Sequence, residues 1–550
     1  MNKNLIWPNT FRAFVLLCLS VVSVGAQATD LISLLRGMVG DPVFKESELY
    51  TSDDDIQIFA YDGTTLEANI FVPTGAADSY PAIIFINSWG MNEYQYLVEA
   101  ARFAEQGYLV LSYSTRGFGE SGGTIATAGP EDIRDVSAAI DFLQNNYPVD
   151  VNRIGVSGIS YGSGISLLSA ATDDRISAVV AMSTWGSLTQ SLYGQYTPRL
   201  IWGGLLTGIG YLTGEPSDEI AINYLDLLKQ ERIDEITAWA DLRSPLSYID
   251  QLNRRRVPVY LANNFGDNLF QPNSVLALYQ ALEGPKKLDL SQGTHAVGEV
   301  LGMGKADHKI WKNAHDWFDF YLKQQDNGIS ERPPVAMEVK FGEYEDLSSW
   351  PSAAVSAQTL YLHEKEIDGD GDMKSSPYSP WWPKKDYFYS GLDTLATTGI
   401  PLLSYFIEDV VEVPVISSMP LISTINAIRW ESDWLSRDMK LRGIPEVRLQ
   451  LTPSKSKAML VAYLYDVDWT GTGRLITHAP YTLLDAVPGQ PITLDMELVA
   501  TAYDVPAGHY LSLVIDTSDL LYSSPGNGLY QIGINYSDNE DSTLILPVKN

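Results

Sequence analysis

Hydrophobic residues in the first 330 positions follow two alternating patterns. Continuous apolar runs, typical of strands buried on both faces of a sheet, occur between segments whose apolar residues recur with helical spacing. The runs are residues 81–87, 108–113, 153–157, 176–183, 257–263 and 286–290. Before them, residues 56–61 and 64–72 alternate around Asp62-Gly63 and predict a hairpin. This pattern predicts an α/β domain over residues 29–330.

The pattern changes after Glu331-Arg332-Pro333-Pro334. Short runs of alternating apolar and polar residues then follow one another between Gly, Pro and Asp, without intervening helical segments. Examples are residues 336–341, 358–362, 447–452, 459–467, 492–498 and 510–516. Strands at this spacing predict an all-β sandwich as a second domain over residues 331–550.

Residues 186–250 interrupt the first domain with a segment that is mostly helix-like and rich in Tyr, Leu and Trp. The segment is too long for a simple connection between two strands. We expect an inserted helical cap over an active site. A helical layer that only covers the sheet is the alternative.

The N-terminus has the pattern of an export signal. Lys3 and Arg12 are positively charged, residues 13–25 are apolar, and Ala26-Gln27-Ala28 provides small residues at a cleavage site. We expect residues 1–28 to be removed and the protein to be periplasmic or secreted, because the apolar run is shorter than the roughly 20 residues that a membrane span needs. The one cysteine, Cys18, lies in this segment. The mature chain would therefore contain no disulfide and no thiolate metal site.

The charge balance limits the partners of the chain. Asp and Glu number 68 against 37 Lys and Arg, and the net charge is −31. This balance disfavours nucleic acid and anionic membranes. The carboxylates of residues 368–372 resemble a calcium loop, but Met373 replaces its glycine and Ser379 its glutamate. We expect no metal, no cofactor and a small-molecule or peptide substrate; the sequence leaves the oligomeric state open.

A Gly-x-Ser-x-Gly pattern, Gly158 to Gly162, lies where the apolar run 153–157 meets a helix-like stretch. Glycines on both sides of Ser160 allow the sharp turn of a nucleophile elbow, which exposes the hydroxyl. We therefore predict that Ser160 is a catalytic nucleophile. The backbone N–H of Tyr161, at the start of the helix, is a candidate oxyanion donor.

A serine nucleophile needs a base, and the base needs an acid that orients it. In this topology the order along the chain is Ser, Asp or Glu, then His, each in a loop after a core strand. Asp267 follows the run 257–263 and His295 follows the run 286–290, so we predict them as the acid and the base. The other histidines lie on a predicted helix or in the β domain: His308, His315, His363, His478 and His509.

Several motifs together resemble one family. They are Gly158-Ile159-Ser160-Tyr161-Gly162, Arg116 to Gly123, Gly129-Pro130-Glu131-Asp132, Gly266-Asp267, Gly293-Thr294-His295 and Val505 to His509. As a set they resemble the X-Pro dipeptidyl-peptidase and cocaine esterase family of α/β-hydrolases. The resemblance implies acyl transfer at Ser160, with His295 as general base and then general acid, and a C-terminal jelly roll.

One position departs from the family pattern. Family members often place a tyrosine, whose hydroxyl completes the oxyanion hole, in the loop that here contains Ser88 and Trp89. A backbone N–H of Ser88 or Trp89 is the expected second donor, and Tyr94 and Tyr96 stay open as alternatives.

We therefore predict an exported serine hydrolase that cleaves acyl bonds through an acyl-enzyme, first as an X-Pro dipeptidyl-peptidase-like peptidase. Carboxylic ester hydrolysis of the cocaine esterase type is the first alternative, and a non-catalytic glycan-binding module is the second alternative. A dipeptidase needs a carboxylate that holds the free amine of its substrate. Glu215, Asp218 and Glu219 of the cap are candidates for this role.

Overall fold

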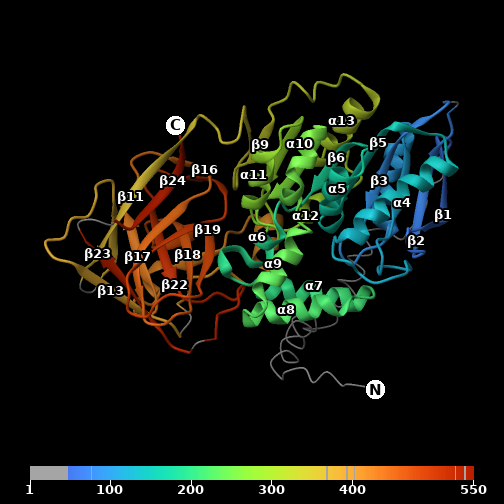
Figure 1. Cartoon of the computed structure of the whole chain (residues 1–550). Helices are drawn as coiled ribbons and strands as arrows, with labels where there is room; N and C mark the ends of the chain where they lie inside the picture. The colour runs from blue at the N-terminus through green and yellow to red at the C-terminus, as the bar shows by residue number, and fades with distance from the viewer. Residues whose placement is uncertain are drawn as a thin grey trace, which may run out of the picture. The chain divides into compact units, whose positions relative to one another are not determined.

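The computed structural model describes residues 47–75, 77–366, 369–391, 394–401, 403–526, 528–537 and 541–550. The predicted export signal, residues 1–28, and Asp368 lie outside the described residues. Glu48–Asn550 form one compact unit, which Figure 1 shows as a ribbon. No helix in this described part is both long and apolar enough to cross a membrane.

A ten-stranded sheet forms the core of the first half of this unit, in the order β1-β2-β4-β3-β5-β6-β7-β8-β9-β10. Its strands are β1 (Tyr50–Phe59), β2 (Thr65–Pro73), β3 (Tyr80–Ile86), β4 (Leu109–Tyr113), β5 (Val149–Ile159), β6 (Ile176–Met182), β7 (Val259–Asn264), β8 (Lys286–Ser291), β9 (Val335–Glu338) and β10 (Tyr344–Leu347). Neighbours from β4 to β9 pair in parallel. The central strands are buried on both faces, as their continuous apolar runs predicted.

The predicted domain boundary at residue 331 falls before this sheet ends. Strands β9 and β10, which the alternating pattern grouped with the β domain, extend the first sheet instead, with β9 parallel to β8. A short alternating run has the same appearance in either sheet, so the pattern alone did not place these two strands.

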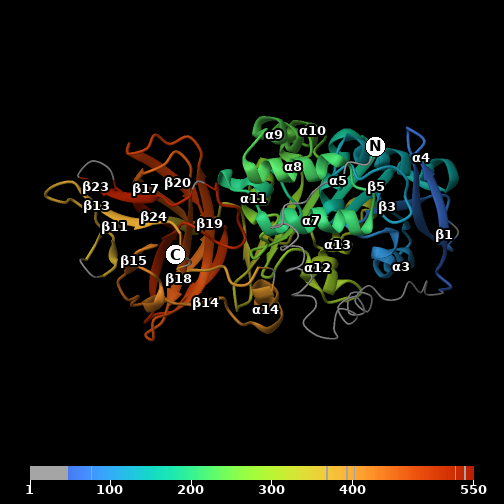
Figure 2. The ribbon, with the colours of Figure 1, turned by 90° about the horizontal axis from the view of Figure 1, so that it is seen from below.

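Helices cover both faces of the sheet. Figure 2 shows α4 (Pro130–Asn146), α5 (Tyr161–Thr172) and α10 (Ile249–Arg255) on one side, and α3 (Leu97–Glu105), α12 (Val297–Gly302) and α13 (Lys309–Lys323) on the other. Phe103 of α3 packs edge to face on Phe318 of α13, with ring centroids 5.9 Å apart. On the opposite face, α11 (Pro272–Ala281) contributes Val275 and Leu278 to the core. This is the α/β-hydrolase fold that the sequence predicted.

The segment between β6 and β7 forms further helices: α6 (Leu188–Tyr193), α7 (Leu200–Thr213), α8 (Asp218–Lys229) and α9 (Ile233–Asp241), before α10. Side chains of α6, α7, α8 and α9 line one pocket together with Ser160. The insertion therefore encloses space above the elbow and does more than cover the sheet.

The C-terminal half is a β-rich domain with a second, 14-stranded sheet. Its strands are β11 (Val355–Lys365), β12 (Gly371–Lys374), β13 (Lys384–Tyr389), β14 (Ile416–Ser418), β15 (Ile428–Ser432), β16 (Met439–Gly443), β17 (Glu446–Pro453), β18 (Ala458–Val467), β19 (Thr472–Leu483), β20 (Ile492–Glu497), β21 (Thr501–Val505), β22 (Tyr510–Asp516), β23 (Gln531–Tyr536) and β24 (Thr543–Lys549). Gln195 Nε2 donates to the carbonyls of Pro480 and Glu497, which ties the cap to this domain. The jelly roll expected here stays a prediction.

Two of the sequence motifs have structural roles. The guanidinium of Arg116 forms a bidentate ion pair with buried Asp135, at 2.8 and 2.7 Å, and also contacts Asp62 at 3.0 Å. Pro130 begins α4, and Asp132 in its first turn accepts a hydrogen bond from the hydroxyl of Tyr161 at 2.6 Å. The motifs therefore join the loop after β4 and the start of α4 to the helix that follows Ser160.

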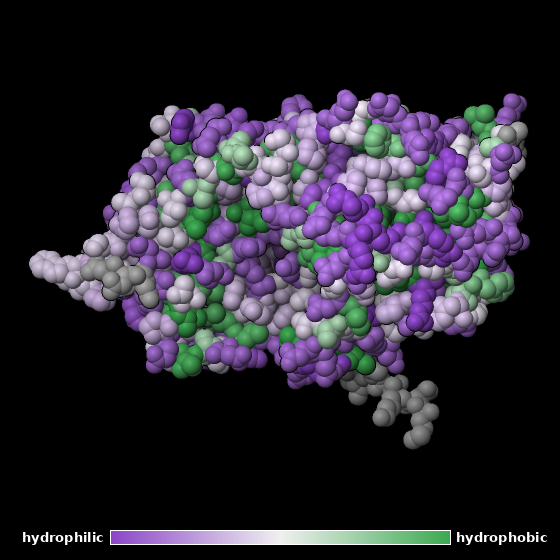
Figure 3. All heavy atoms as spheres, turned by 45° about the horizontal axis from the view of Figure 1, so that its top comes forward, coloured by the Kyte–Doolittle hydropathy of each residue, from purple (hydrophilic) through white to green (hydrophobic). Residues whose placement is uncertain are grey.

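Hydrophilic side chains cover most of the face shown in Figure 3, as expected for so acidic a chain.

Asp132 gives a prediction about stability. Burial raises the pKa of Asp132 to about 7, although its hydrogen bond from Tyr161 acts in the opposite direction. A carboxyl whose pKa is raised in the folded state stabilises the fold most below its unfolded pKa, and this contribution is lost as the pH rises through the folded value. In the wild type we expect the unfolding free energy to fall by on the order of 4 kcal/mol between pH 4 and 7. Asp132→Asn, which keeps an acceptor for Tyr161, should not show this fall.

Urea unfolding of the wild type and of Asp132→Asn at several pH values in this range measures the difference. Parallel curves for the two proteins would contradict the raised pKa.

Candidate active site

The nucleophile elbow lies between the end of β5 at Ile159 and the start of α5 at Tyr161. Ser160 has φ of 56° and ψ of −118°, a strained conformation for a residue with a side chain. A Cβ atom at Gly158 would lie 2.5 Å from the carbonyl carbon of Gly162, and one at Gly162 would lie 2.0 Å from the carbonyl oxygen of Ile86. Neither position accepts a side chain, so the two glycines permit the turn that presents Ser160.

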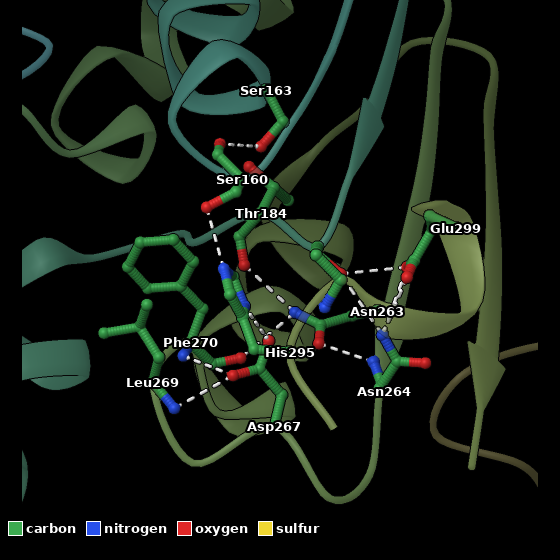
Figure 4. A network of polar contacts seen from close by, with 12 residues as sticks. Ser160, Ser163, Thr184, Asn263, Asn264, Asp267, Leu269, Phe270, His295 and Glu299 are labelled. Atoms are coloured by element: carbon green, nitrogen blue, oxygen red, sulfur yellow. Dashed lines mark hydrogen bonds and ion pairs between the residues drawn. The ribbon is translucent and has the colours of Figure 1, made fainter. Parts of the chain in front are cut away.

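Three side chains predicted from separate loops come together at this turn (Figure 4). Ser160 Oγ lies 2.7 Å from His295 Nε2, and His295 Nδ1 lies 2.7 Å from Asp267 Oδ2. The other carboxylate oxygen, Oδ1, accepts the N–H groups of Leu269 and Phe270 at 2.9 and 2.8 Å. With Nδ1–H donating to the carboxylate, Nε2 is free to accept the proton of Ser160.

Aromatic side chains restrict the imidazole of His295. The ring of Phe270 lies edge to face with it at a centroid distance of 5.1 Å, and that of Trp202 from α7 at 5.6 Å. Asp267 is 1% exposed. The hydrogen-bonded pair is therefore largely shielded from water, which strengthens its electrostatic interaction.

A buried network behind His295 was not predicted from the sequence. The N–H of Ala296 donates to Ser183 Oγ at 3.1 Å, and this hydroxyl donates to Glu299 Oε1 at 2.9 Å. Asn264 Nδ2 donates to the same oxygen at 3.1 Å (Figure 4). Glu299 is 2% exposed, and burial raises its pKa. No sequence signal distinguishes Glu299 from other acidic residues, because its partners come from β7 and from the end of β6.

The candidate oxyanion donors differ in whether their N–H or O–H groups are free to bind a substrate oxygen. The N–H of Ser88 donates to Gln95 Oε1 at 2.7 Å, so the prediction of Ser88 as a donor is wrong: its hydrogen is already bound by a side chain. The hydroxyl of Tyr96 accepts the N–H of Ile159 at 2.8 Å, and neither Tyr94 nor Tyr96 lines the pocket with Ser160. The N–H groups of Trp89 and Tyr161 have no acceptor among the described residues. They stay the two predicted donors.

The side chains of Trp89 and Tyr161 are held away from the reacting atoms. The hydroxyl of Tyr161 donates to Asp132 and accepts the N–H of Ala128 at 3.1 Å. The indole N–H of Trp89 donates to the carbonyl of Leu206 in α7 at 2.9 Å, and its ring packs edge to face on Tyr161. Only the backbone of these residues is available to an oxyanion.

A pocket of about 120 Å³ opens at Ser160 under the cap. Its walls are mainly apolar and include Leu192 from α6, Leu206 from α7 and Trp239 from α9. The acids considered for amine binding are elsewhere: Glu215, Asp218 and Glu219 are exposed to solvent, and none of them lines the pocket. That expectation is corrected, because Glu215 lies in the connection between α7 and α8, and Asp218 and Glu219 lie in the first turn of α8, all with exposed side chains.

Known proteins resemble this chain over most of its length. A putative Xaa-Pro dipeptidyl-peptidase of Bacillus cereus is 21% identical over 464 residues, which cover 76% of this chain and 73% of the relative. A putative Xaa-Pro dipeptidyl-peptidase of Streptomyces avermitilis is 21% identical over 491 residues, covering 76% and 68%.

Solved structures show that the fold is shared. A CocE/NonD family hydrolase from Staphylococcus aureus superimposes with a TM-score of 0.69 at 14% identity, covering 93% of this chain and 100% of the other. An α-amino acid ester hydrolase superimposes with a TM-score of 0.70 at 16% identity, covering 92% and 98%.

Two family models match successive parts of the chain. Residues 62–297 match the X-Pro dipeptidyl-peptidase (S15 family) model, and residues 327–545 match the model of the X-Pro dipeptidyl-peptidase C-terminal non-catalytic domain. The two matches together cover most of the chain, so the chain belongs to the X-Pro dipeptidyl-peptidase family of serine hydrolases.

Proposed function

We propose that the chain hydrolyses acyl bonds through an acyl-enzyme at Ser160, with His295 as the base and Asp267 as the group that orients it. The observation that carries this proposal is the continuous line of contacts, each 2.7 Å, from Ser160 through His295 to Asp267 at the mouth of a pocket. A buried serine hydroxyl in such an arrangement loses its proton as it attacks a carbonyl.

The reaction follows from these positions. His295 Nε2 takes the proton of Ser160 Oγ while the oxygen attacks the substrate carbonyl, and the N–H groups of Trp89 and Tyr161 stabilise the negative charge that develops. His295 then returns the proton to the leaving nitrogen or oxygen. A water molecule attacks the acyl-enzyme in the same way and releases the acid. The carboxylate of Asp267 stabilises the imidazolium that forms.

Peptide and amide bonds are the substrate class that the family relationship favours. Both matching models are described as X-Pro dipeptidyl-peptidase, and so is the Bacillus cereus relative. Hydrolysis of carboxylic esters is the second candidate, supported by the apolar pocket, which lacks a carboxylate among its described lining residues. Both reactions use the same groups and differ in the leaving atom that His295 protonates.

The β-rich domain contributes no described residue to this pocket or to the contacts of Ser160, His295 and Asp267. We propose that it supports the catalytic domain, and that glycan binding is not the function of the chain. Export to the periplasm or the medium is part of the proposal and is supported by the pattern of residues 1–28.

Variants of Ser160 and Asp267 test the proposed catalytic roles. We expect Ser160→Ala to abolish turnover and Asp267→Asn to lower kcat by about 10⁴-fold, because asparagine no longer holds the required tautomer of His295. Release of 4-nitrophenol from an aryl ester and of 4-nitroaniline from an anilide measures both. Full activity of Asp267→Asn beside an inactive Ser160→Ala would show that another residue orients His295.

Glu299 is expected to position the loop that carries His295. In Glu299→Gln the side-chain amide faces donors from Ser183 and Asn264, so one donor loses its acceptor and the loop that carries His295 shifts. We expect kcat to fall about 10-fold to 100-fold with little change in KM, since the substrate pocket lies on the other side of His295. Glu343→Gln, in the turn between β9 and β10, is the matched control. Equal kinetics in the two variants would exclude a positioning role.

The relative rates on an anilide and an ester separate the peptidase from the esterase. A peptidase is expected to cleave an anilide and an ester of the same acyl group with kcat/KM values within about 100-fold, whereas an esterase cleaves only the ester above the Ser160→Ala blank. Steady-state rates for one matched pair of substrates decide between them.

A further inference from the structure

The pocket under the cap has an unusual charge composition for a relative of dipeptidases. Among the described residues that line it there is no Asp and no Glu, and the one charged residue is Arg199. Leu269 and Phe270, which follow the orienting Asp267, present apolar side chains to the same space. A protonated amine placed there would find no opposite charge.

Arg199 adds a positive charge without a compensating carboxylate. It is 3% exposed, and its hydrogen bonds among the described residues go to neutral acceptors and not to an Asp or Glu. Its guanidinium donates to the carbonyl of Ser191 at 3.2 Å and to Gln271 Oε1 at 2.6 Å, and it lies 4.9 Å from the ring centre of Tyr522. A second cation in the pocket would be repelled across a medium of low dielectric constant.

Three buried carboxylates around the site already have hydrogen-bond partners. Asp267 accepts from His295 and from two backbone N–H groups. Asp132 lies behind Tyr161 and accepts its hydroxyl, and Glu299 lies behind the loop of His295. None of the three lines the pocket, so none can hold a substrate amine without breaking the site itself.

We propose that the acyl group accepted at Ser160 is apolar and uncharged, and that the pocket excludes a protonated α-amine. The substrates are therefore N-blocked peptides, amides or esters with an apolar acyl part, and the enzyme is not an aminopeptidase of free N-termini. This inference rests on the proposed function and names the substrate class of the same site. Transfer of an unpaired ammonium group into such a pocket is strongly unfavourable.

The test compares two pairs of substrates that differ only in the amine. They are alanyl-proline 4-nitroanilide and its N-acetyl form, and phenylalanine methyl ester and its N-acetyl form, with Ser160→Ala as the blank. We expect the N-acetyl member to have kcat/KM at least about 30-fold higher at pH 6.5 in each pair that is turned over, because only about 3% of an amine with a pKa of about 8 is neutral at that pH. Preference for the free amine would overturn the inference while leaving the proposed function intact.

The pH dependence of this ratio is a second readout. The α-amine has a pKa of about 8, so the neutral form that the pocket admits becomes more abundant as the pH rises to that value. The ratio of free-amine to N-acetyl kcat/KM should rise about 10-fold per pH unit from 6 to 8 and then level off. The titratable or charged residues that line the pocket are Arg199, Tyr193, Tyr224 and Tyr161, whose hydroxyl is bound to Asp132, with His295 at the mouth. They act on both members of a pair, so the ratio isolates the amine.

A change in the pocket should reverse the selectivity. Leu192 on α6 is only half-buried and lines the pocket, so it accepts a polar replacement more readily than the core does. Leu192→Glu should shift the ratio toward the free amine by at least about 10-fold relative to Leu192→Gln, which has the same shape and no charge. An unchanged ratio would show that the acyl group does not occupy this pocket. If no substrate is cleaved faster than in Ser160→Ala, the proposed function fails first, and the inference with it.

Discussion

The close approach of Gly162 to the end of β3 is the constraint on which the site depends. Because a Cβ atom there would lie 2.0 Å from the carbonyl oxygen of Ile86, the first turn of α5 and the loop after β3 form one rigid piece. Ser160 comes from one side of this contact and Trp89 from the other. The proposed nucleophile and both candidate oxyanion donors therefore keep a fixed geometry, and the sheet around them holds Ser160 at its unfavourable φ and ψ.

His295 and Asp267, the proposed base and its orienting acid, are held by different means. Asp267 and His295 lie in loops after β7 and β8, next to the elbow because parallel strands present their carboxyl ends on one edge. Hydrogen bonds from Leu269 and Phe270 fix one carboxylate oxygen of Asp267, which leaves the other for the imidazole. The network of Ser183, Asn264 and Glu299 fixes the loop of His295 from behind. Each loop is thus tied to the sheet by buried polar contacts that are costly to break.

Selectivity and chemistry reside in different parts of the domain. The sheet and its loops supply Ser160, His295 and Asp267, whereas the helices inserted after β6 supply most of the pocket wall. An apolar wall with a single buried cation disfavours a positively charged acyl group. The indole of Trp89 connects the two parts, because its N–H binds the carbonyl of Leu206 in the cap.

The sequence alone determined the features that depend on local patterns. Apolar periodicity located the core strands, the spacing of Gly158, Ser160 and Gly162 located the elbow, and chain order with strand position selected Asp267 and His295. Tertiary structure decided what depends on contacts between distant segments. In the folded chain β9 and β10 belong to the first sheet, and the N–H of Ser88 donates to Gln95. Glu299 lies behind His295. The candidate amine-binding residues Glu215, Asp218 and Glu219 are exposed to solvent. Periodicity and motif spacing describe neighbours along the chain, whereas burial and hydrogen-bond partners are set by residues that only the folded chain brings together.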